Sequence, residues 1–333
     1  HIGYDKLPEI IKNIRKTILS CGGEFLFETK ITDFIIKENQ IEGIICEKGN
    51  IYKNSHIILA TGLSARDIYT TLHEKNILLE SKNFAIGVRV EHPQSLINKI
   101  QYKKEAGNPF LPQASYNLSE RVDERAVYSF CMCPGGTIVP AATSKNEIVV
   151  NGMSNSTRKS PFANAGIVVE TRYEDIPDFH QYGVLAGLKF QEHIENLAYL
   201  NGGGEQRAPA QNLIDFINGK LGPELPECSY LPGVISSPIH FWLPDFISKR
   251  LQKSFKLFNK KMRGFLSSEA LIVGVESRST SPIRIPRDKE TMEHIEIKGL
   301  YPCGEGSGYA GGITSSAIDG EKCAEIIAMK LKK

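Results

Sequence analysis

The chain has 333 residues, of which 23% are charged and 41% are hydrophobic, and its formal net charge at pH 7 is +2. That length is enough for about two domains, and the small net charge gives no global field that favours nucleic acid or a membrane as partner. No apolar run reaches the roughly 18 residues of a membrane-spanning helix. The seven cysteines, an odd number spread over a long chain, favour reduced thiols and a cytoplasmic location.

The first 62 residues predict one helix followed by short strands. Apolar residues recur at helical spacing over residues 5–20, and Gly22 and Gly23 follow as a stop signal. The next strand-like runs predict a three-stranded meander and then a buried strand that ends in Ala60-Thr61-Gly62. In chain order these runs are 24–29, 31–36, 41–46 and 55–62.

The middle of the chain alternates strand-like runs with turns from residue 84 to residue 170, which predicts a β-rich second domain. The expected strands include 126–132, 136–140, 147–151 and 166–171. Helical spacing returns at 182–200 and again at 209–221, with a triple glycine between the two expected helices.

Residues 245–265 combine positive charge with an apolar stripe at helical spacing, and no acidic residue lies between 246 and 268. The basic residues are Lys249, Arg250, Lys253, Lys256, Lys260, Lys261 and Arg263. Such a helix can contact RNA or an anionic membrane surface. A solvated basic face above a buried apolar stripe is commoner and accounts for every large side chain, so we favour it.

Near the C-terminus a glycine-rich loop separates a strand-like run, 297–301, from a helix that begins at Ile313. The glycines of this closing loop are Gly304, Gly306, Gly308, Gly311 and Gly312. Glycines let backbone N–H groups approach a ligand, and a helix N-terminus favours negative charge. A phosphate or an electron-rich ring is therefore the expected ligand, and a plain flexible linker is the alternative.

Within the closing loop, Gly306, Gly308 and Gly311 match the dinucleotide fingerprint G-x-G-x-x-G. The fingerprint requires a second strand after its helix, and one helix follows here, so we do not expect a Rossmann unit to open at this loop. The loop instead resembles the C-terminal return to the FAD domain in flavoproteins of the glutathione-reductase-like superfamily. That resemblance implies that Glu305 accepts hydrogen bonds from ribityl or ribose hydroxyls and that the helix start faces the flavin.

The N-terminal order of helix, Gly-Gly, meander and a strand ending in Ala-Thr-Gly is similar to a segment of FAD-dependent oxidoreductases that leaves the sheet and returns. The similarity implies that this turn packs against the dinucleotide, and that the backbone at the start of the meander faces the adenine. The residues implied to bind the cofactor are Lys30, Ile31, Ala60, Thr61, Gly62, Gly304, Glu305, Gly306, Gly308, Gly311, Gly312 and Ile313.

Further stretches narrow the resemblance; they are 84–93, 129–136, 150–154, 274–285 and the closing loop. Together they resemble the bacterial family of uncharacterised FAD-dependent dehydrogenases, also called NAD(FAD)-utilising dehydrogenases. The N-terminal strand of that family, which carries G-x-G-x-x-G, is missing. The chain begins at His1, and we expect it to be a fragment that corresponds to the C-terminal two-thirds of such a protein.

The resemblance implies a mixed α/β (α+β) fold, with an incomplete FAD/NAD(P)-binding Rossmann-like domain and a β-rich substrate domain with helical insertions. Residues 1–83 and 286–333 are assigned to the FAD-binding domain. Residues 84–285 are assigned to the substrate or cap domain, with a helical insertion at about 177–265.

Two cysteines are candidates for chemistry. Cys131 and Cys133 lie two apart in an expected strand, so both thiols should face one side. A zinc site needs about four ligands, and no second pair completes one, so no metal is expected. The pair is either a redox relay beside a flavin or, as we favour, buried packing. Cys303 is expected to be packed as well.

Charged residues in strand-like runs form the second candidate set. Glu276, Arg278 and Arg284 lie in one such run. The two guanidinium groups either hold a substrate carboxylate or the flavin pyrimidine edge, or all three charges lie solvated on a surface strand. Arg89, Glu91 and His92 present the same alternatives. The candidate catalytic residues are Arg278 and Cys133.

The expected function is that of an FAD-dependent oxidoreductase, a dehydrogenase that exchanges a hydride between flavin and a small-molecule substrate or NAD(P)H. The fragment alone can lack activity. One alternative is a flavin-dependent RNA-modifying enzyme that binds RNA through Lys249 to Arg263. The other is a non-enzymatic module that retains the flavoprotein fold.

Overall fold

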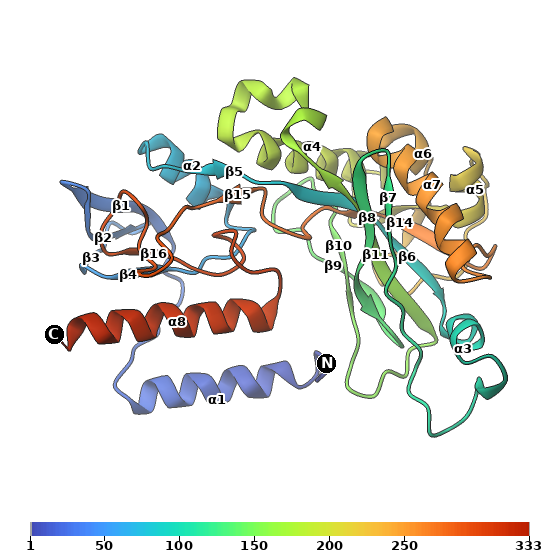
Figure 1. The fold of residues 1–333 in the computed structure, drawn as a ribbon, viewed down its shortest axis with the longest axis horizontal. Coiled ribbons are helices and arrows are strands. Elements are labelled where there is room, and N and C mark those ends of the chain that lie inside the picture. The colour runs from blue at the N-terminus through green and yellow to red at the C-terminus, as the bar shows by residue number, and fades with distance from the viewer. Residues whose placement is uncertain (1, 333) are drawn as a thin grey trace. The chain divides into compact units, whose positions relative to one another are not determined.

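The computed structural model describes residues 2–332 and has the mixed α/β fold that the sequence predicts (Figure 1). The chain divides into two compact units, each assembled from three segments. Unit 1 comprises His1–Gly23, Ala85–Thr171 and Gln191–Ser279, and unit 2 comprises Glu24–Phe84, Arg172–Phe190 and Thr280–Lys333. Within the described range, no helix is long and apolar enough to cross a bilayer.

Unit 1 is built on a seven-stranded mixed sheet with the order β13-β12-β14-β6-β11-β8-β7. Strands β12 and β13 are parallel, whereas β14 pairs antiparallel with β12 and β6, and β8 pairs antiparallel with β11 and β7. A separate antiparallel pair joins β9 and β10. The strands are β6 (Phe84–Pro93), β7 (Ser119–Val122), β8 (Arg125–Cys133), β9 (Thr137–Pro140), β10 (Val150–Met153), β11 (Phe162–Thr171), β12 (Ala208–Asn212), β13 (Val234–Ser236) and β14 (Leu271–Glu276).

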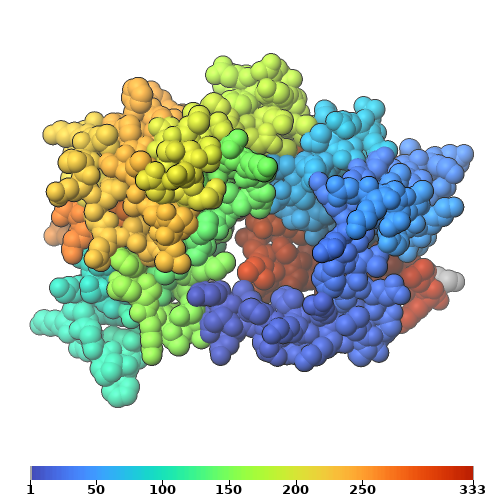
Figure 2. Space-filling model, turned by 180° about the vertical axis from the view of Figure 1, so that it is seen from behind, coloured from blue at the N-terminus to red at the C-terminus, as the bar shows by residue number. Residues whose placement is uncertain are grey.

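The longest of the helices that lie wholly in unit 1, α7, packs against β7, β8 and β11 (Figure 1). After α3 and a short 3-10 turn, Lys103–Glu105, the chain forms a loop that projects from the unit, drawn in turquoise in Figures 1 and 2. The helices are α1 (Leu7–Ser20), α3 (Gln94–Tyr102), α4 (Ala186–Asn201), α5 (Leu213–Asn218), α6 (Ile239–Trp242) and α7 (Asp245–Lys261), of which α4 begins in unit 2.

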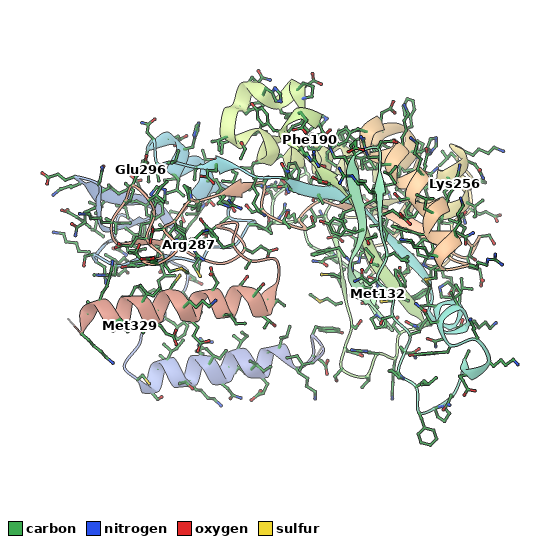
Figure 3. All side chains as sticks on the ribbon, viewed as in Figure 1. Met132, Phe190, Lys256, Arg287, Glu296 and Met329 are labelled. Carbon is green, nitrogen blue, oxygen red and sulfur yellow. The ribbon has the colours of Figure 1, made fainter. Side chains whose placement is uncertain are left out.

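Helix α7 confirms the amphipathic interpretation of residues 245–265. Its apolar stripe is fully buried and consists of Ile247, Leu251, Phe255 and Phe258. The ring of Phe255 lies 5.9 Å from that of Phe216 and 6.2 Å from that of Phe265, measured between centroids. Burial of a side chain of this size contributes about 1.5–3 kcal/mol. Packing therefore explains the stripe, while the basic side chains, such as Lys256 in Figure 3, project outward.

In its described residues, unit 2 contains three small sheets and two complete helices, besides the first turn of α4. Its meander is β1 (Ile31–Lys37), β2 (Gln40–Cys46) and β3 (Ile51–Lys53). Strand β4 (Ile57–Leu59) pairs parallel with β16 (Leu300–Pro302), and β5 (Glu80–Ser81) pairs antiparallel with β15 (Ile283–Arg284). The helices are α2 (Arg66–Glu74) and α8 (Ile313–Leu331), with 3-10 segments at Tyr173–Asp175 and Pro177–Leu185. The core gathers around Leu59, Tyr69 and Leu300.

The strand predicted at residues 24–29 does not form, and β3 is the third strand of the meander instead. Glu28 has a φ of 51°, in the left-handed region, which interrupts an extended backbone. Without a partner strand, the apolar side chains of Phe25, Leu26 and Phe27 stay 38%, 53% and 63% exposed.

The helix predicted at 209–221 is also wrong in its first part, because β12 occupies Ala208–Asn212 and α5 begins at Leu213. Strand β12 lies between two neighbours and is buried on both faces, so its sequence shows no alternation that would mark a strand. The side chain of Asn212 then accepts a hydrogen bond from the Ile214 backbone N–H (2.9 Å), which begins the helix.

The two units differ from the predicted domain bounds in three segments. His1–Gly23 belongs to unit 1, although residues 1–83 were assigned to the FAD-binding domain together with 286–333, whereas Arg172–Phe190 and residues 280–285 belong to unit 2. The carboxylate of Asp5 accepts hydrogen bonds from the backbone N–H and the hydroxyl of Ser156, both at 2.6 Å, which ties the first segment to unit 1. The function of each unit stays a prediction.

Candidate functional site

The loops that follow β4 and β16 meet at one end of unit 2. Because the two strands are parallel, their carboxyl ends lie at the same edge, and the Cys303 N–H donates to the Leu59 carbonyl (3.0 Å). A Cβ added to Gly306 would lie 2.5–2.9 Å from backbone atoms of Gly62. The structure therefore brings the predicted turn at residues 60–62 together with the closing loop, and only glycine fits at the crossing.

The backbone itself requires glycine at three predicted positions. Gly62 and Gly304 both have a φ of 76°, and Gly308 has a φ of 83°. This left-handed region strains residues that carry a Cβ. These three glycines shape the two loops, whereas Gly311 and Gly312 have no such backbone requirement.

Tyr69, on α2, holds in place the point where Gly306 packs against Gly62. Its hydroxyl donates to the Gly306 carbonyl (2.6 Å) and lies 3.1 Å from the Ser281 hydroxyl. The side chain is 1% exposed, and burial raises the pKa of Tyr69 to about 12. The phenol is therefore a neutral donor at any physiological pH.

A second anchor joins the loop to α8. Asp319 accepts hydrogen bonds from both terminal nitrogens of Arg287 (2.6 and 2.9 Å) and from the Gly304 N–H (2.8 Å). Arg287, labelled in Figure 3, also donates to the Pro302 carbonyl (2.6 Å), and its guanidinium lies 3.9 Å from the centroid of the Tyr309 ring. Burial alone would raise the pKa of Asp319, but these donors lower it.

The carboxylate of Glu305, in contrast, forms no hydrogen bond and no ion pair with any residue that the structure describes, although the Glu305 backbone carbonyl accepts from the Gly308 N–H (3.0 Å). The carboxyl group is partly buried, and burial raises its pKa, while the charge of Lys82 acts in the opposite direction. A carboxylate that has lost part of its hydration and has no donor is unfavourable. A ligand that presents hydroxyl groups would supply the missing donors.

The N-terminus of α8 is open as well. Gly312 is the N-cap residue, and no side chain caps the helix, so the N–H groups of the first turn are available and carry partial positive charge. A Cβ added to Gly311 or to Gly312 would meet nothing within 4 Å, and Ile313 is 73% exposed. An uncapped 19-residue helix beside an unpartnered carboxylate fits a cofactor with sugar hydroxyls and an electron-rich ring, as FAD has.

Two predicted residues are not brought to this loop. The Lys30 ammonium pairs with Asp67 (3.0 Å), and the Lys30 carbonyl accepts from the Glu47 N–H (2.9 Å). Ile31 begins β1, and a cavity of about 130 Å³ lies beside Lys30. No hydrogen bond or ion pair among the described residues joins either residue to the closing loop, so their role at the adenine stays a prediction.

Arg278 lies in unit 1 and has its donors engaged. The guanidinium bonds Glu195 (2.8 Å) and Glu147 (2.9 Å) and donates to the Thr143 hydroxyl (2.6 Å). The carboxyl of Glu276, 1% exposed, likewise pairs with fully buried Arg89 (2.6 Å). The alternative of solvated surface charges is therefore wrong for Glu276 and Arg278, while Arg284 pairs at 3.8 Å with Glu80 on a more exposed strand.

Cys131 and Cys133 do not lie in a regular stretch of β8. Cys131 has a φ of 45°, and the register with β11 shifts beside it, which indicates a bulge. Cys131 is exposed, so the expectation that both thiols are buried is wrong for it. Cys133 is half-buried and donates to the Cys131 carbonyl (3.3 Å), and burial raises its pKa. A raised pKa disfavours the reactive thiolate, and the catalytic role of Cys133 stays a prediction.

Cys303 and Cys323 are buried, and their sulfurs lie within 4.8 Å of an Asp319 oxygen, which is a possible ligand set for a metal. Both Asp319 oxygens are already bonded to Arg287, and that guanidinium also approaches the Cys323 sulfur at 3.8 Å. A metal cation there would be repelled by a fixed positive charge. We therefore assign no metal to this cluster.

Sequence patterns did not identify Tyr69, Arg287 and Asp319, which position the loop. Their partners lie far away in the sequence, 237 residues in the case of Tyr69 and Gly306. The one usable signal is Asp319, an acidic residue four positions before buried Cys323 on the face of α8 that points into the unit.

The chain is similar to several known proteins. It is 40% identical over 334 residues to an uncharacterized protein of Clostridium beijerinckii, an alignment that covers 99% of this chain and 62% of that protein. It is also 32% identical over 78 residues to a D-amino acid dehydrogenase of Helicobacter pylori, covering 23% of this chain and 18% of that enzyme. The chain thus spans less than two thirds of either relative.

Among solved structures, an oxidoreductase from Methanosarcina mazei aligns with 95% of this chain and 53% of its own, at 11% identity and a TM-score of 0.33, a likeness too distant to support an inference. A family model, described as FAD-dependent protein, C-terminal domain-like, matches residues 83–279, which is more than half of the sequence. The chain therefore belongs to this family of FAD-dependent proteins.

Proposed function

We propose that the whole protein is an FAD-dependent oxidoreductase and that the closing loop of unit 2, with residues 60–62, forms part of its FAD site. One observation carries the assignment of the site: the unpartnered, partly buried carboxylate of Glu305 lies in the loop that leads to the uncapped N-terminus of α8. Family membership supports the cofactor, and the partial similarity to a dehydrogenase supports the reaction class.

In this proposal Glu305 accepts hydrogen bonds from sugar or ribityl hydroxyls, and the first turn of α8 faces the part of the cofactor that carries negative charge. Tyr69 and the Arg287–Asp319 pair hold the loop in place for this contact. Bound FAD would supply hydride acceptance and donation. A small molecule and NADH or NADPH are the proposed hydride donors and acceptors.

Replacement of Glu305 by alanine in the full-length protein tests the site. We expect the affinity for FAD to fall about tenfold or more, because hydrogen bonds to a charged group contribute about 1.5–3 kcal/mol. Glu296→Ala is the matched control, since Glu296 is an exposed carboxylate of the same unit (Figure 3). Equal affinities of the two variants would refute the assignment of Glu305, and a full-length protein that shows no flavin absorption after incubation with FAD would refute the function.

The RNA-modifying alternative gains no support from α7. Lys249 pairs with Asp245 (2.5 Å), Lys253 with Asp123 (2.6 Å) and Lys261 with Glu120 (2.8 Å). Much of the basic face is thus neutralised by the protein itself, and RNA binding through this helix stays a prediction.

A further inference from the structure

The basic residues of α7 and its C-terminal extension fall into two groups. Those toward the N-terminus are engaged by the protein: Lys249 and Lys253 pair with carboxylates, and Arg250 donates to the carbonyls of Val122 and Asp123. Toward the C-terminus, Lys260 and Arg263 form no ion pair with any described residue. Lys256 likewise has no ion pair with a described residue, so the unneutralised charge lies in the C-terminal half of the helix and just beyond it, where Lys261 alone pairs with a carboxylate, that of Glu120 (2.8 Å).

At that end lies a cavity of about 1000 Å³, entirely within unit 1, between the end of α3, residues 116–118 and the segment after α7. Its lining contains five basic side chains and no acidic one. The basic residues are Lys99, Lys103, Lys260, Lys261 and Arg263. Only Lys261 has a carboxylate partner in the part of the chain that the structure describes, namely Glu120 at 2.8 Å.

Four unpaired cations around one concavity repel one another, and an anion inside the cavity would relieve this repulsion. A simpler explanation exists for part of the set, since Lys99 and Lys260 lie in the last turns of α3 and α7, where a cation complements the helix dipole. Lys103 is the C-cap residue of α3 and benefits in the same way. The dipole does not account for Arg263, which lies past the C-cap residue of α7, nor for the absence of any acidic residue from the lining.

Apart from Gln101, Asn117 and Gly264, the rest of the lining is apolar or aromatic. Ile100, Tyr116, Leu118 and Met262 contribute, and the last three are buried. Tyr116 is 7% exposed, and its hydroxyl has no hydrogen-bond partner among the described residues. A ligand that fits needs an apolar or planar body as well as negative charge.

We propose that this cavity binds a phosphorylated ligand of the nucleotide class, with its base on the apolar lining and its phosphates at Lys99, Lys103, Lys260 and Arg263. The cations come from separate segments and converge on one hollow, which suits a compact ligand. A nucleic-acid strand would instead use a continuous basic stripe, and the ion pairs of Lys249 and Lys253 interrupt such a stripe along α7.

Isothermal titration calorimetry of the full-length protein with ADP and with pyrophosphate tests this proposal, in excess FAD so that ADP does not enter a flavin site. The triple variant Lys99→Gln/Lys103→Gln/Lys260→Gln should weaken ADP binding at least about tenfold. The control Lys12→Gln/Lys16→Gln/Lys256→Gln removes three exposed lysines of the same unit outside the cavity and should change the dissociation constant less than about twofold.

Comparison of ADP with pyrophosphate separates the two parts of the ligand, and tighter binding of ADP is expected because the apolar lining contacts the nucleoside. Equal weakening in both triple variants would overturn the proposal, because it would indicate a diffuse field rather than a site. Absence of binding by both probes at about 1 mM would overturn it as well. A short RNA that binds with a steep salt dependence while ADP does not would replace it with a nucleic-acid site. None of these readouts depends on the proposed oxidoreductase activity.

Discussion

The buried charges of unit 1 and the closing loop of unit 2 satisfy their polar groups in opposite ways. Arg89 donates to Glu276, Asn164 and the Cys131 carbonyl, and no part of its side chain reaches solvent. Glu305 and the start of α8, by contrast, leave an acceptor and several donors without partners in the described structure. A charged residue in a suggestive motif is therefore a ligand candidate only if the fold leaves its hydrogen-bonding groups without partners.

The largest expected effect comes from removing one partner of the buried Arg89–Glu276 pair in unit 1. Arg89→Met leaves the carboxylate of Glu276 buried without its cation, which should lower the free energy of unfolding by about 3–5 kcal/mol, measured by urea denaturation. The double variant Arg89→Met/Glu276→Leu removes both charges and should recover most of that loss. If Arg89→Met lost less than about 1 kcal/mol of unfolding free energy, Glu276 would not depend on Arg89 to compensate its buried charge.

His92 lies in the same strand as Arg89 and is also fully buried, so its titration tests how strongly unit 1 excludes water from its polar groups. Burial lowers the pKa of His92 to about 4, from an ordinary value of 6.5. The unfolded chain therefore binds more protons than the folded one between these pH values, so stability rises with pH across the window and is lost as the pH falls. Between about pH 7 and about pH 5 this group should cost about 2 kcal/mol of unfolding free energy. In His92→Gln that part of the pH dependence should disappear; an unchanged pH profile would contradict it.

Tyr69 belongs to the core of unit 2 and bonds the closing loop, so an intermediate effect is expected. Tyr69→Phe keeps the ring but removes the short hydrogen bond to the Gly306 carbonyl and leaves that carbonyl only the Ser281 hydroxyl at 3.5 Å, which should destabilise the protein by about 1–2 kcal/mol in thermal or urea unfolding. The affinity for FAD should fall as well, because the loop loses its anchor. If stability falls and the flavin affinity does not, the loop does not depend on this hydrogen bond for binding.

The smallest effect on stability is expected at Glu305, in the closing loop of unit 2. Burial raises the pKa of Glu305, which means that the fold disfavours the charged form of this carboxyl group. Glu305→Gln removes that charge. The free energy of unfolding without cofactor should therefore stay within about 0.5 kcal/mol of the parent value or rise slightly. A loss of more than about 1 kcal/mol would show that Glu305 has a structural partner and would break the contrast with Arg89.

Periodicity and glycine content were sufficient to predict α7, α8 and the loop that joins β16 to α8, because each depends on neighbours within a few residues. They failed at β12, where burial on both faces erases the alternating pattern, and at Cys131, where a bulge reverses the side-chain direction. The anchors of the site were out of reach for another reason. Arg287 and Asp319 lie 32 residues apart, and no local pattern pairs an arginine in a loop with an acid on a later helix.

The open space around Gly311 and Gly312 has a consequence for genetic selection. Both positions can accept larger residues without a clash in the protein alone, whereas Gly306, pressed against Gly62, cannot. A saturation library sorted for soluble expression should therefore retain many substitutions at 311 and 312 and none at 306. The same library sorted for flavin retention should lose diversity at 311 and 312 too, so the difference between the two sorted pools would outline the footprint of the cofactor.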